Sequence, residues 1–166
     1  MDGIRAWCAT AALACVLVAC GADNGEGIEA ASTTRPPEPV ASALVAGEAQ
    51  ARVRIGDDCL DVLVADTAEE RAIGLSEKDS LGRFAGMLFV WDTDVDSAFY
   101  MYRTRIPLTI GWYGPDGDPI GRTDMEPCPE PVPEDCPEYR PPGRYRYALE
   151  VGSGALPGGA LAACPT

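Results

Sequence analysis

The sequence predicts one mainly-β domain over residues 51–166, a compact sandwich or barrel of about six to eight short strands with one short helix. Short segments in which apolar and polar residues alternate recur from residue 52 onward. Turn-forming residues separate these segments, and helix start and stop signals occur together at one place only. Strands that outnumber helices in this way are typical of a sandwich or a barrel.

The first predicted elements are a β-hairpin and a helix. Residues 52–55 and 60–65 alternate in polarity, and a Gly-Asp-Asp turn separates them. Thr67 and Glu70 have the spacing of a capping box, in which each side chain accepts a hydrogen bond from the other residue's backbone N–H. Gly74 is typical of the residue that ends a helix. A short helix is therefore predicted just after the hairpin.

More strands are predicted in the middle of the chain. Residues 87–91 form a short apolar strand, and the Asp-rich segment 92–96 is expected to be a loop before the strand 98–102. Residues 109–113 and 119–123 flank the sequence Gly-Pro-Asp-Gly-Asp, which is a turn signal. These two segments are predicted to form a second hairpin.

The last predicted strand has the clearest alternation. Apolar or aromatic residues alternate with polar ones at Tyr145, Tyr147, Leu149 and Val151 against Arg144, Arg146 and Glu150. This pattern predicts a half-buried strand.

No pair of carboxylates stands out for acid–base chemistry, because sequence spacing does not place two of them across a pocket. Solvated surface carboxylates are the favoured interpretation.

Composition excludes several classes of function. The chain has 166 residues, 13 Lys plus Arg against 26 Asp plus Glu, and a net charge of -13. Nucleic acid is not expected as a partner, because phosphate binding needs a basic face. The chain has no His, which excludes Ser-His-Asp hydrolysis and His-ligated metal sites. Lys78 is its single lysine, so Lys chemistry would have to use that residue.

The N-terminus predicts export and a lipid anchor. Residues 1–19 contain Arg5 and then an apolar run too short for a comfortable membrane span, as in a signal peptide. The end of this run, Leu-Val-Ala followed by Cys20, resembles the bacterial lipobox, which implies lipidation of Cys20. We therefore expect a lipoprotein of the cell envelope, held on the outer membrane if the host has two membranes. An uncleaved anchor or a plain secretory peptide is the alternative. Residues 20–50 have the composition of a disordered tether.

Export changes the expected state of the cysteines. Four remain in the predicted domain, at Cys59, Cys128, Cys136 and Cys164. An even number in an oxidising compartment indicates disulfides, and four cysteines allow three connectivities. Cys128 and Cys136 bracket a short Pro-rich loop, which favours their pairing and leaves Cys59 for Cys164. Free or metal-bound thiols are the less favoured alternative, because no Cys-x-x-Cys pair exists.

One acidic segment resembles the start of a calcium loop. Asp92, Asp94 and Asp96 have the Asp-x-Asp-x-Asp spacing of an EF-hand. Ser97 and Arg103 stand where that loop needs Gly and Glu. A solvated loop is the favoured interpretation, so we expect no metal and no cofactor.

Residues 51–159 resemble an uncharacterised bacterial and archaeal family, domain of unknown function 192. The residues that carry the resemblance are Ala65-Asp66-Thr67-Ala68-Glu69-Glu70-Arg71, Gly74-Leu75, Gly86-Met87-Leu88-Phe89, Phe99-Tyr100-Met101, Thr104, Ile106-Pro107-Leu108, Cys128, Cys136-Pro137, Tyr139 and Tyr145 to Val151. Their order and spacing make the resemblance specific, although no single motif is diagnostic. It implies a compact β-sandwich-like fold and supplies no reaction.

The chain departs from the family pattern at several polar positions. Ser76 replaces a Met, Tyr100 replaces a Trp, and Tyr102 with Arg103 replaces a Lys-Asn pair. Thr109 stands where the family has an Asp after Pro-Leu. Any chemistry that depends on that Lys or Asp in relatives would be missing from this chain.

The segment around Tyr100, Arg103 and Thr104 is the predicted ligand site. Tyr rings would stack on a ligand, and Arg103 would pair with an anion bidentately. Tyr100 and Arg103 have opposite parity in an ideal strand, so this site requires the strand to bend or end near Tyr102. A structural strand with core on one side and tyrosines on the other is the favoured alternative.

The leading functional hypothesis is a membrane-anchored lipoprotein without catalytic residues. Its β-sandwich would bind a small anionic ligand, a glycan or an envelope protein. The first alternative is a carboxylate-dependent envelope hydrolase or transferase. The second is a structural accessory subunit without a pocket.

Overall fold

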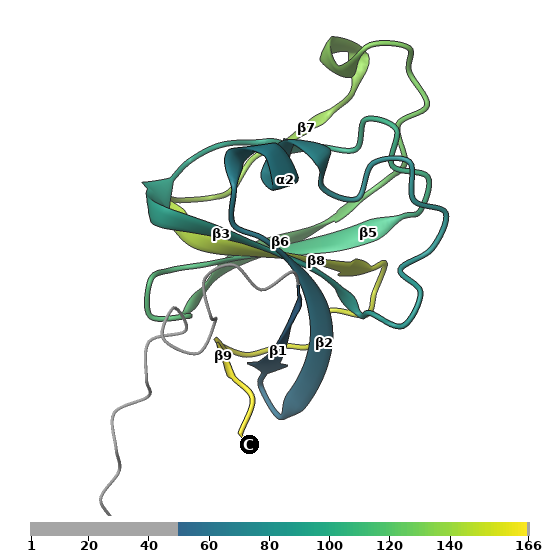
Figure 1. Ribbon diagram of the computed structural model, residues 1–166. Coiled ribbons are helices and arrows are strands. Elements are labelled where there is room, and N and C mark those ends of the chain that lie inside the picture. Colours follow the sequence, from purple (N-terminus) through teal and green to yellow (C-terminus); the bar gives the residue numbers. More distant parts are fainter. Residues whose placement is uncertain (1–49, 166) are drawn as a thin grey trace, which may run out of the picture. The chain divides into compact units, whose positions relative to one another are not determined.

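A curled seven-stranded sheet dominates the computed structural model, which describes residues 50–165 (Figure 1). The strands of this sheet are β1 (Gln50–Ile55), β2 (Asp58–Ala65), β3 (Gly86–Val95), β5 (Leu108–Tyr113), β6 (Pro119–Met125), β8 (Tyr145–Gly152) and β9 (Leu161–Ala163). Their order is β6-β5-β8-β3-β2-β1-β9. Neighbouring strands are antiparallel except β2 and β3, which run parallel.

Smaller elements complete the described chain. The helix α2 (Ala68–Ile73) lies over one face of the sheet, on the crossover between β2 and β3 (Figure 1). A second, two-stranded sheet joins β4 (Phe99–Tyr100) to β7 (Glu138–Tyr139), and a 3-10 turn, η1 (Pro133–Asp135), precedes β7. The predicted fold class, a mainly-β sandwich or barrel with one short helix, is confirmed.

Local sequence signals explain most of these elements. The first predicted hairpin is β1–β2, and its register pairs Val53 with Leu60. The capping box is present: the Thr67 hydroxyl accepts from the Glu70 N–H, and the Glu70 carboxylate accepts from the Thr67 N–H. Gly74 ends the helix with a φ of 50°, a left-handed conformation that favours glycine. The second predicted hairpin is β5–β6.

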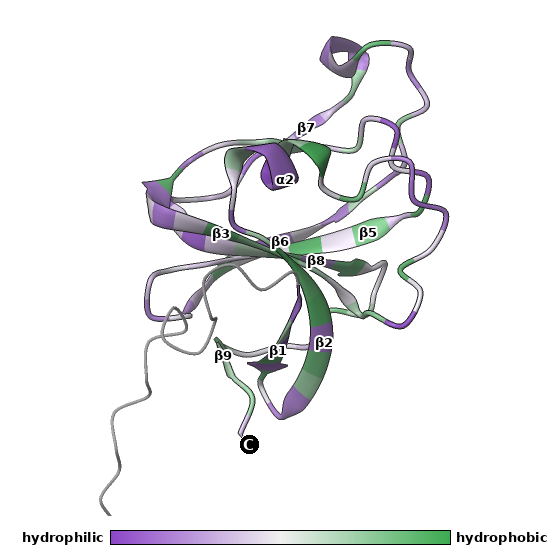
Figure 2. Cartoon of the chain, in the orientation of Figure 1, coloured by the Kyte–Doolittle hydropathy of each residue, from purple (hydrophilic) through white to green (hydrophobic). Residues whose placement is uncertain are grey.

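The sheet has an apolar core on each face. Met87, Phe89, Ile110 and Ala148 belong to the core on the face that α2 covers. The second core lies on the other face, inside the curl that β1, β2 and β9 complete, and includes Val53, Val62, Leu88, Tyr147, Leu149 and Leu161. Figure 2 shows apolar residues concentrated along the strands, whereas α2 is hydrophilic in its middle and apolar at its end, and it contains no buried residue. The central strands are therefore covered on both sides, which sequence alternation did not reveal.

Two segments differ from the sequence predictions. The Asp-rich segment expected to be a loop continues β3 as far as Val95, which pairs with Tyr145 after an irregularity in the ladder. Arg146 donates to the Asp94 carboxylate at 2.9 Å, and this neutralises part of the acidic run. The strand expected at 98–102 is only the two-residue β4, because the chain turns at Arg103, whose φ is 54°.

Both expected disulfides are present. Cys59 of β2 is bonded to Cys164, and Cys128 is bonded to Cys136, each with 5.8 Å between Cα atoms. The predicted signal peptide, the predicted lipidation of Cys20 and all of the predicted tether except Gln50, the first residue of β1, lie outside the part that the structure describes. Within residues 50–165, no helix is long and apolar enough to cross a membrane.

Candidate functional site

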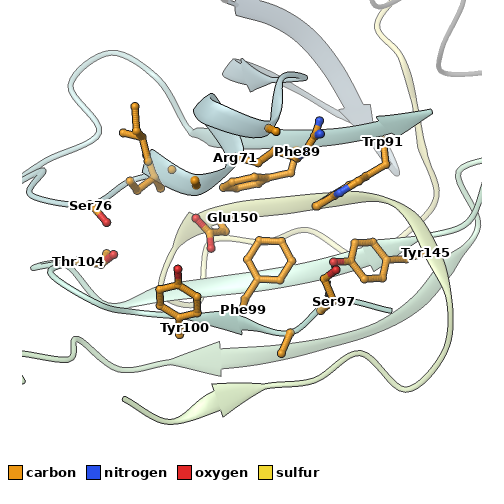
Figure 3. Close-up of a pocket in the computed structure, with 16 residues that line it drawn as sticks. Arg71, Ser76, Phe89, Trp91, Ser97, Phe99, Tyr100, Thr104, Tyr145 and Glu150 are labelled. Carbon is orange, nitrogen blue, oxygen red and sulfur yellow. Dashed lines mark hydrogen bonds between the residues drawn. The ribbon is translucent and has the colours of Figure 1, made fainter. Parts of the chain in front are cut away.

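A cavity of about 360 Å³ lies between α2 and the sheet face below it (Figure 3). This volume is at the lower end of the range for small-molecule sites, roughly 300–1,000 Å³. Its lining combines aromatic rings, hydroxyl groups and one carboxyl group, at Phe89, Trp91, Phe99, Tyr100, Tyr145, Ser76, Ser97, Thr104 and Glu150. The backbone and small side chains of α2 and the residues just after it supply the rest.

Four aromatic rings form one end of the cavity. Phe89 and Trp91 come from β3, Phe99 from β4 and Tyr145 from β8. Trp91 meets the Tyr145 ring edge to face at a centroid distance of 5.1 Å, and Phe89 meets Phe99 in the same way at 5.2 Å. The Tyr145 hydroxyl donates to the Ser97 carbonyl at 2.9 Å, which fixes the ring. Such edge-to-face contacts hold the rings in place before any ligand arrives.

Glu150 is the only carboxyl group in the cavity lining, and it is 5 % exposed. It lies in β8, an interior strand of the main sheet, opposite Met87 of β3 and Ile110 of β5. Among residues 50–165, its carboxyl group has no hydrogen-bond or ion-pair partner, and Figure 3 shows it pointing into the cavity. Burial raises the pKa of Glu150 to about 8, because the charged form is disfavoured away from water.

Hydroxyl groups line the cavity together with the carboxyl group of Glu150. Thr104 is buried at 6 % exposure, and Tyr100 turns its hydroxyl toward the cavity (Figure 3). The Ser76 hydroxyl donates to the Tyr102 carbonyl at 3.0 Å, which ties the segment after α2 to the turn after β4. The polar end of the cavity is therefore built from neutral hydroxyls around one carboxyl.

Arg71 is the only cation in the lining. Its guanidinium donates to the carbonyls of Asp66 and Val90, and it lies over the Trp91 ring at 5.2 Å from the centroid. Both hydrogen bonds come from Nη1, so Arg71 holds α2 against β3 through that nitrogen, and its charge acts on Tyr145 at the aromatic end of the cavity. No charge partner acts on Glu150, whose raised pKa has burial as its cause.

The structure brings two of the three predicted site residues together. Tyr100 and Thr104 line the cavity, whereas Arg103 does not. The Arg103 guanidinium lies 3.0 Å from the Glu77 carboxylate and over the ring of Tyr102, in an exposed position. The left-handed backbone of Arg103 turns its side chain away from Tyr100.

Arg103 instead lines a second hollow of about 540 Å³, and Thr104 lines this hollow as well as the cavity. This hollow also contains Arg105, whose guanidinium pairs with the Asp79 carboxylate at 3.0 Å. Both guanidinium groups are more than half exposed, and each already has a carboxylate partner. An anion there would have to displace those carboxylates in full contact with water.

Glu150 and the four aromatic rings at one end of the cavity were not predicted as site residues from the sequence. The interpretation of Glu150 as one of the solvated surface carboxylates is wrong, because β8 is covered on both faces. One signal was available: Glu150 belongs to the segment Tyr145 to Val151, which carries part of the family resemblance. Phe89 and Phe99 also belong to segments that carry the family resemblance, but an apolar residue in a strand is expected to lie in the hydrophobic core.

No metal site is found among the described residues. No group of three or more Cys, Asp or Glu side chains within residues 50–165 is arranged to hold an ion. The three aspartates with calcium-loop spacing lie on and just after β3, where Asp94 accepts from Arg146.

Comparisons with known proteins agree with the fold and give no reaction. The model of the family DUF192, described as Uncharacterized ACR, matches residues 51–160. A protein of unknown function from Novosphingobium aromaticivorans DSM 12444 has a similar structure, with a TM-score of 0.57, 25% identity, and coverage of 71% of this chain and 88% of that one. A protein from Sinorhizobium meliloti 1021, named as a candidate transcription regulator, has a TM-score of 0.59, 23% identity, and coverage of 68% and 92%. No curated protein matches the chain.

Proposed function

The chain belongs to the DUF192 family, and from that premise we propose that its domain binds a small molecule in the cavity between α2 and the sheet. The observation that carries this proposal is the buried Glu150 carboxyl group, which faces the cavity without a protein partner among residues 50–165. The Glu150 oxygens are reached only through the cavity, so a molecule bound there is the partner available to them among the described residues.

Binding is favoured over catalysis by the inventory of the cavity. Carboxylate-dependent hydrolases use two carboxyl groups on opposite sides of the reacting bond. Glu150 is the only carboxyl group in the lining, and the nearby hydroxyls have no adjacent base to activate them. The raised pKa of Glu150 would suit a general acid, so a hydrolase remains the second function to test.

We further propose that this domain works at a membrane surface, in the cell envelope. Support comes from the sequence alone: the apolar run that ends in Leu-Val-Ala before Cys20, and the tether-like composition of residues 20–50. Both disulfides of the domain agree with an oxidising compartment. Incorporation of a labelled fatty acid by the wild type, and its loss in Cys20→Ser, would support the anchor. Absence of label from the wild type would refute it.

The binding proposal is tested by blocking the cavity. Ala72 of α2 lines it, so Ala72→Trp places an indole in the available space. Glu69 lies on the same helix outside the lining, so Glu69→Trp is the matched control. We expect NMR screening of the full chain against a library of small polar fragments to give hits that perturb resonances of Phe89 and Glu150. Those hits should disappear in Ala72→Trp and persist in Glu69→Trp.

Two results would contradict the proposal. The first is a library without any fragment that perturbs the cavity resonances. The second is a set of fragments that bind Ala72→Trp as well as they bind the wild type. Release of product from a chromogenic glycoside, abolished by Glu150→Gln, would instead identify the domain as a hydrolase.

A further inference from the structure

We propose that the ligand is an uncharged, hydroxyl-bearing molecule about as large as one monosaccharide, and that Glu150 binds it as a protonated carboxyl group that donates a hydrogen bond. This inference rests on the proposed function and specifies the class of ligand for the same cavity. It depends on which groups face Glu150, on their charges, and on the division of the cavity into a polar and an aromatic end.

The surroundings of Glu150 favour its neutral form. Its nearest neighbours across the sheet are Met87 and Ile110, which are apolar. Thr104 and Tyr100 of β4 line the same cavity and contribute hydroxyl groups to it. An isolated carboxylate in such surroundings is strongly disfavoured, and the group keeps its proton instead.

The charged and titratable groups of the surrounding elements do not reverse this. On α2, the Arg71 guanidinium is held by two backbone carbonyls and by Trp91. On β8, the pKa of the Tyr145 hydroxyl is raised by burial, and this hydroxyl donates to Ser97. The pKa of Glu150, about 8, therefore keeps the group mostly protonated at neutral pH.

A protonated carboxyl group selects an uncharged partner. It donates one hydrogen bond and accepts others, as do the hydroxyls of Thr104 and Tyr100 beside it. An anionic ligand hydrogen-bonded to Glu150 would find no cation beside it, because Arg71 lies over Trp91 with Nη1 on two backbone carbonyls and has no effect on the pKa of Glu150. A cationic ligand would bind well only after Glu150 had lost its proton. Hydroxyl and carbonyl groups match this set of donors and acceptors without a change of charge.

The two ends of the cavity match a molecule with a polar edge and an apolar face. In Figure 3, Ser76, Thr104 and Tyr100 lie toward one side, and Trp91 and Tyr145 toward the other. A pyranose ring has this character, because its hydroxyls lie at the edge while its C–H groups form flat apolar patches that pack on aromatic rings. The cavity volume of about 360 Å³ is large enough for one such ring.

The test compares three probes of similar shape at about pH 6, where Glu150 is protonated. The probes are methyl glucoside, which is neutral, glucosamine, which is a cation at this pH, and methyl glucuronide, an anion. Binding to the full chain is followed by NMR. We expect the neutral sugar to bind most tightly and to perturb Phe89 and Glu150 resonances.

The pH dependence identifies the protonated carboxyl group. If only the protonated form binds, raising the pH to about 9 weakens binding of methyl glucoside by about tenfold, because the pKa is then exceeded by about one unit. Glu150→Gln keeps a neutral donor and acceptor, so its affinity should stay constant over this range. A constant affinity in the wild type would overturn the role of Glu150.

The other outcomes are equally decisive. Tighter binding of glucosamine would mean that Glu150 acts as a carboxylate for a cation, which contradicts the inference. If library fragments fill the cavity but none of the three sugars does, the inferred ligand class is wrong while the proposed function stands. If no fragment binds in a way that Ala72→Trp blocks, the proposed function fails as well.

Discussion

Replacement of Glu150 by Gln should change how the stability of the protein depends on pH. The pKa of the carboxyl group is 4.5 in a model peptide and about 8 in the folded protein. Between these values the folded state holds more protons than the unfolded state, so this group makes stability fall as pH rises. Its contribution is fully present below pH 4.5 and is lost as pH passes the folded value.

The size of the effect follows from the shift in pKa. Each pKa unit corresponds to about 1.4 kcal/mol, so the loss is about 3 kcal/mol at neutral pH and about 5 kcal/mol well above the folded pKa. Gln has nearly the shape of a protonated Glu and does not titrate. Glu150→Gln should therefore match the wild type near pH 4.5 and exceed its stability increasingly as pH rises.

Urea denaturation of both chains at about pH 5, 7 and 9 measures this difference. The matched control is Glu69→Gln, at an exposed position of α2, and its stability should follow the wild type at every pH. A constant difference between Glu150→Gln and the wild type would refute the reasoning. It would mean that the ionised carboxylate of Glu150 reaches water or a partner in solution.

Three further variants test the structure around the site. Gly86→Ala would place a Cβ only 1.8 Å from the Glu150 carbonyl oxygen across the β3–β8 ladder. It should therefore lower the free energy of unfolding by more than about 3 kcal/mol. An unchanged melting temperature would contradict this packing. The double change Cys59→Ser and Cys164→Ser opens a loop with a sequence separation of 105. Urea titration should show that the free energy of unfolding falls by about 4–5 kcal/mol. A decrease below about 1 kcal/mol would mean that the disulfide adds little stability in solution. Arg103→Ala removes an exposed ion pair, so calorimetry should show that the free energy of unfolding falls by less than about 1 kcal/mol. Sugar binding should be unchanged. Weaker sugar binding would mean that Arg103 belongs to the ligand site.

Local signals in the sequence were sufficient for most of the secondary structure. The hairpin turns, the capping box of Thr67 and Glu70, and the helix stop at Gly74 depend on neighbouring residues, and the structure contains each of them. The family motifs indicated the fold class correctly as well. These features need no knowledge of which distant segments meet.

The parts that depend on distant contacts could not be predicted. The place of β8 between β3 and β5 buries both of its faces, and this removes Glu150 from water despite a pattern that resembles a half-exposed strand. The parallel pairing of β2 with β3 is another such contact. The left-handed turn at Arg103 separates that side chain from Tyr100, although the two residues are close in sequence. The site therefore combines side chains whose proximity only the sheet order reveals.

The most direct test of ligand binding by a protonated Glu150 is the pKa of this group, measured from the ¹³C shift of its carboxyl carbon with and without methyl glucoside. If the ligand binds the protonated form of Glu150, the pKa should be near 8 in the free protein and higher in the saturated complex. A ligand that prefers the protonated form must strengthen proton binding by the same factor. A value near 4.5 in the free protein, or one that the sugar leaves unchanged or lowers, would contradict this mode of binding.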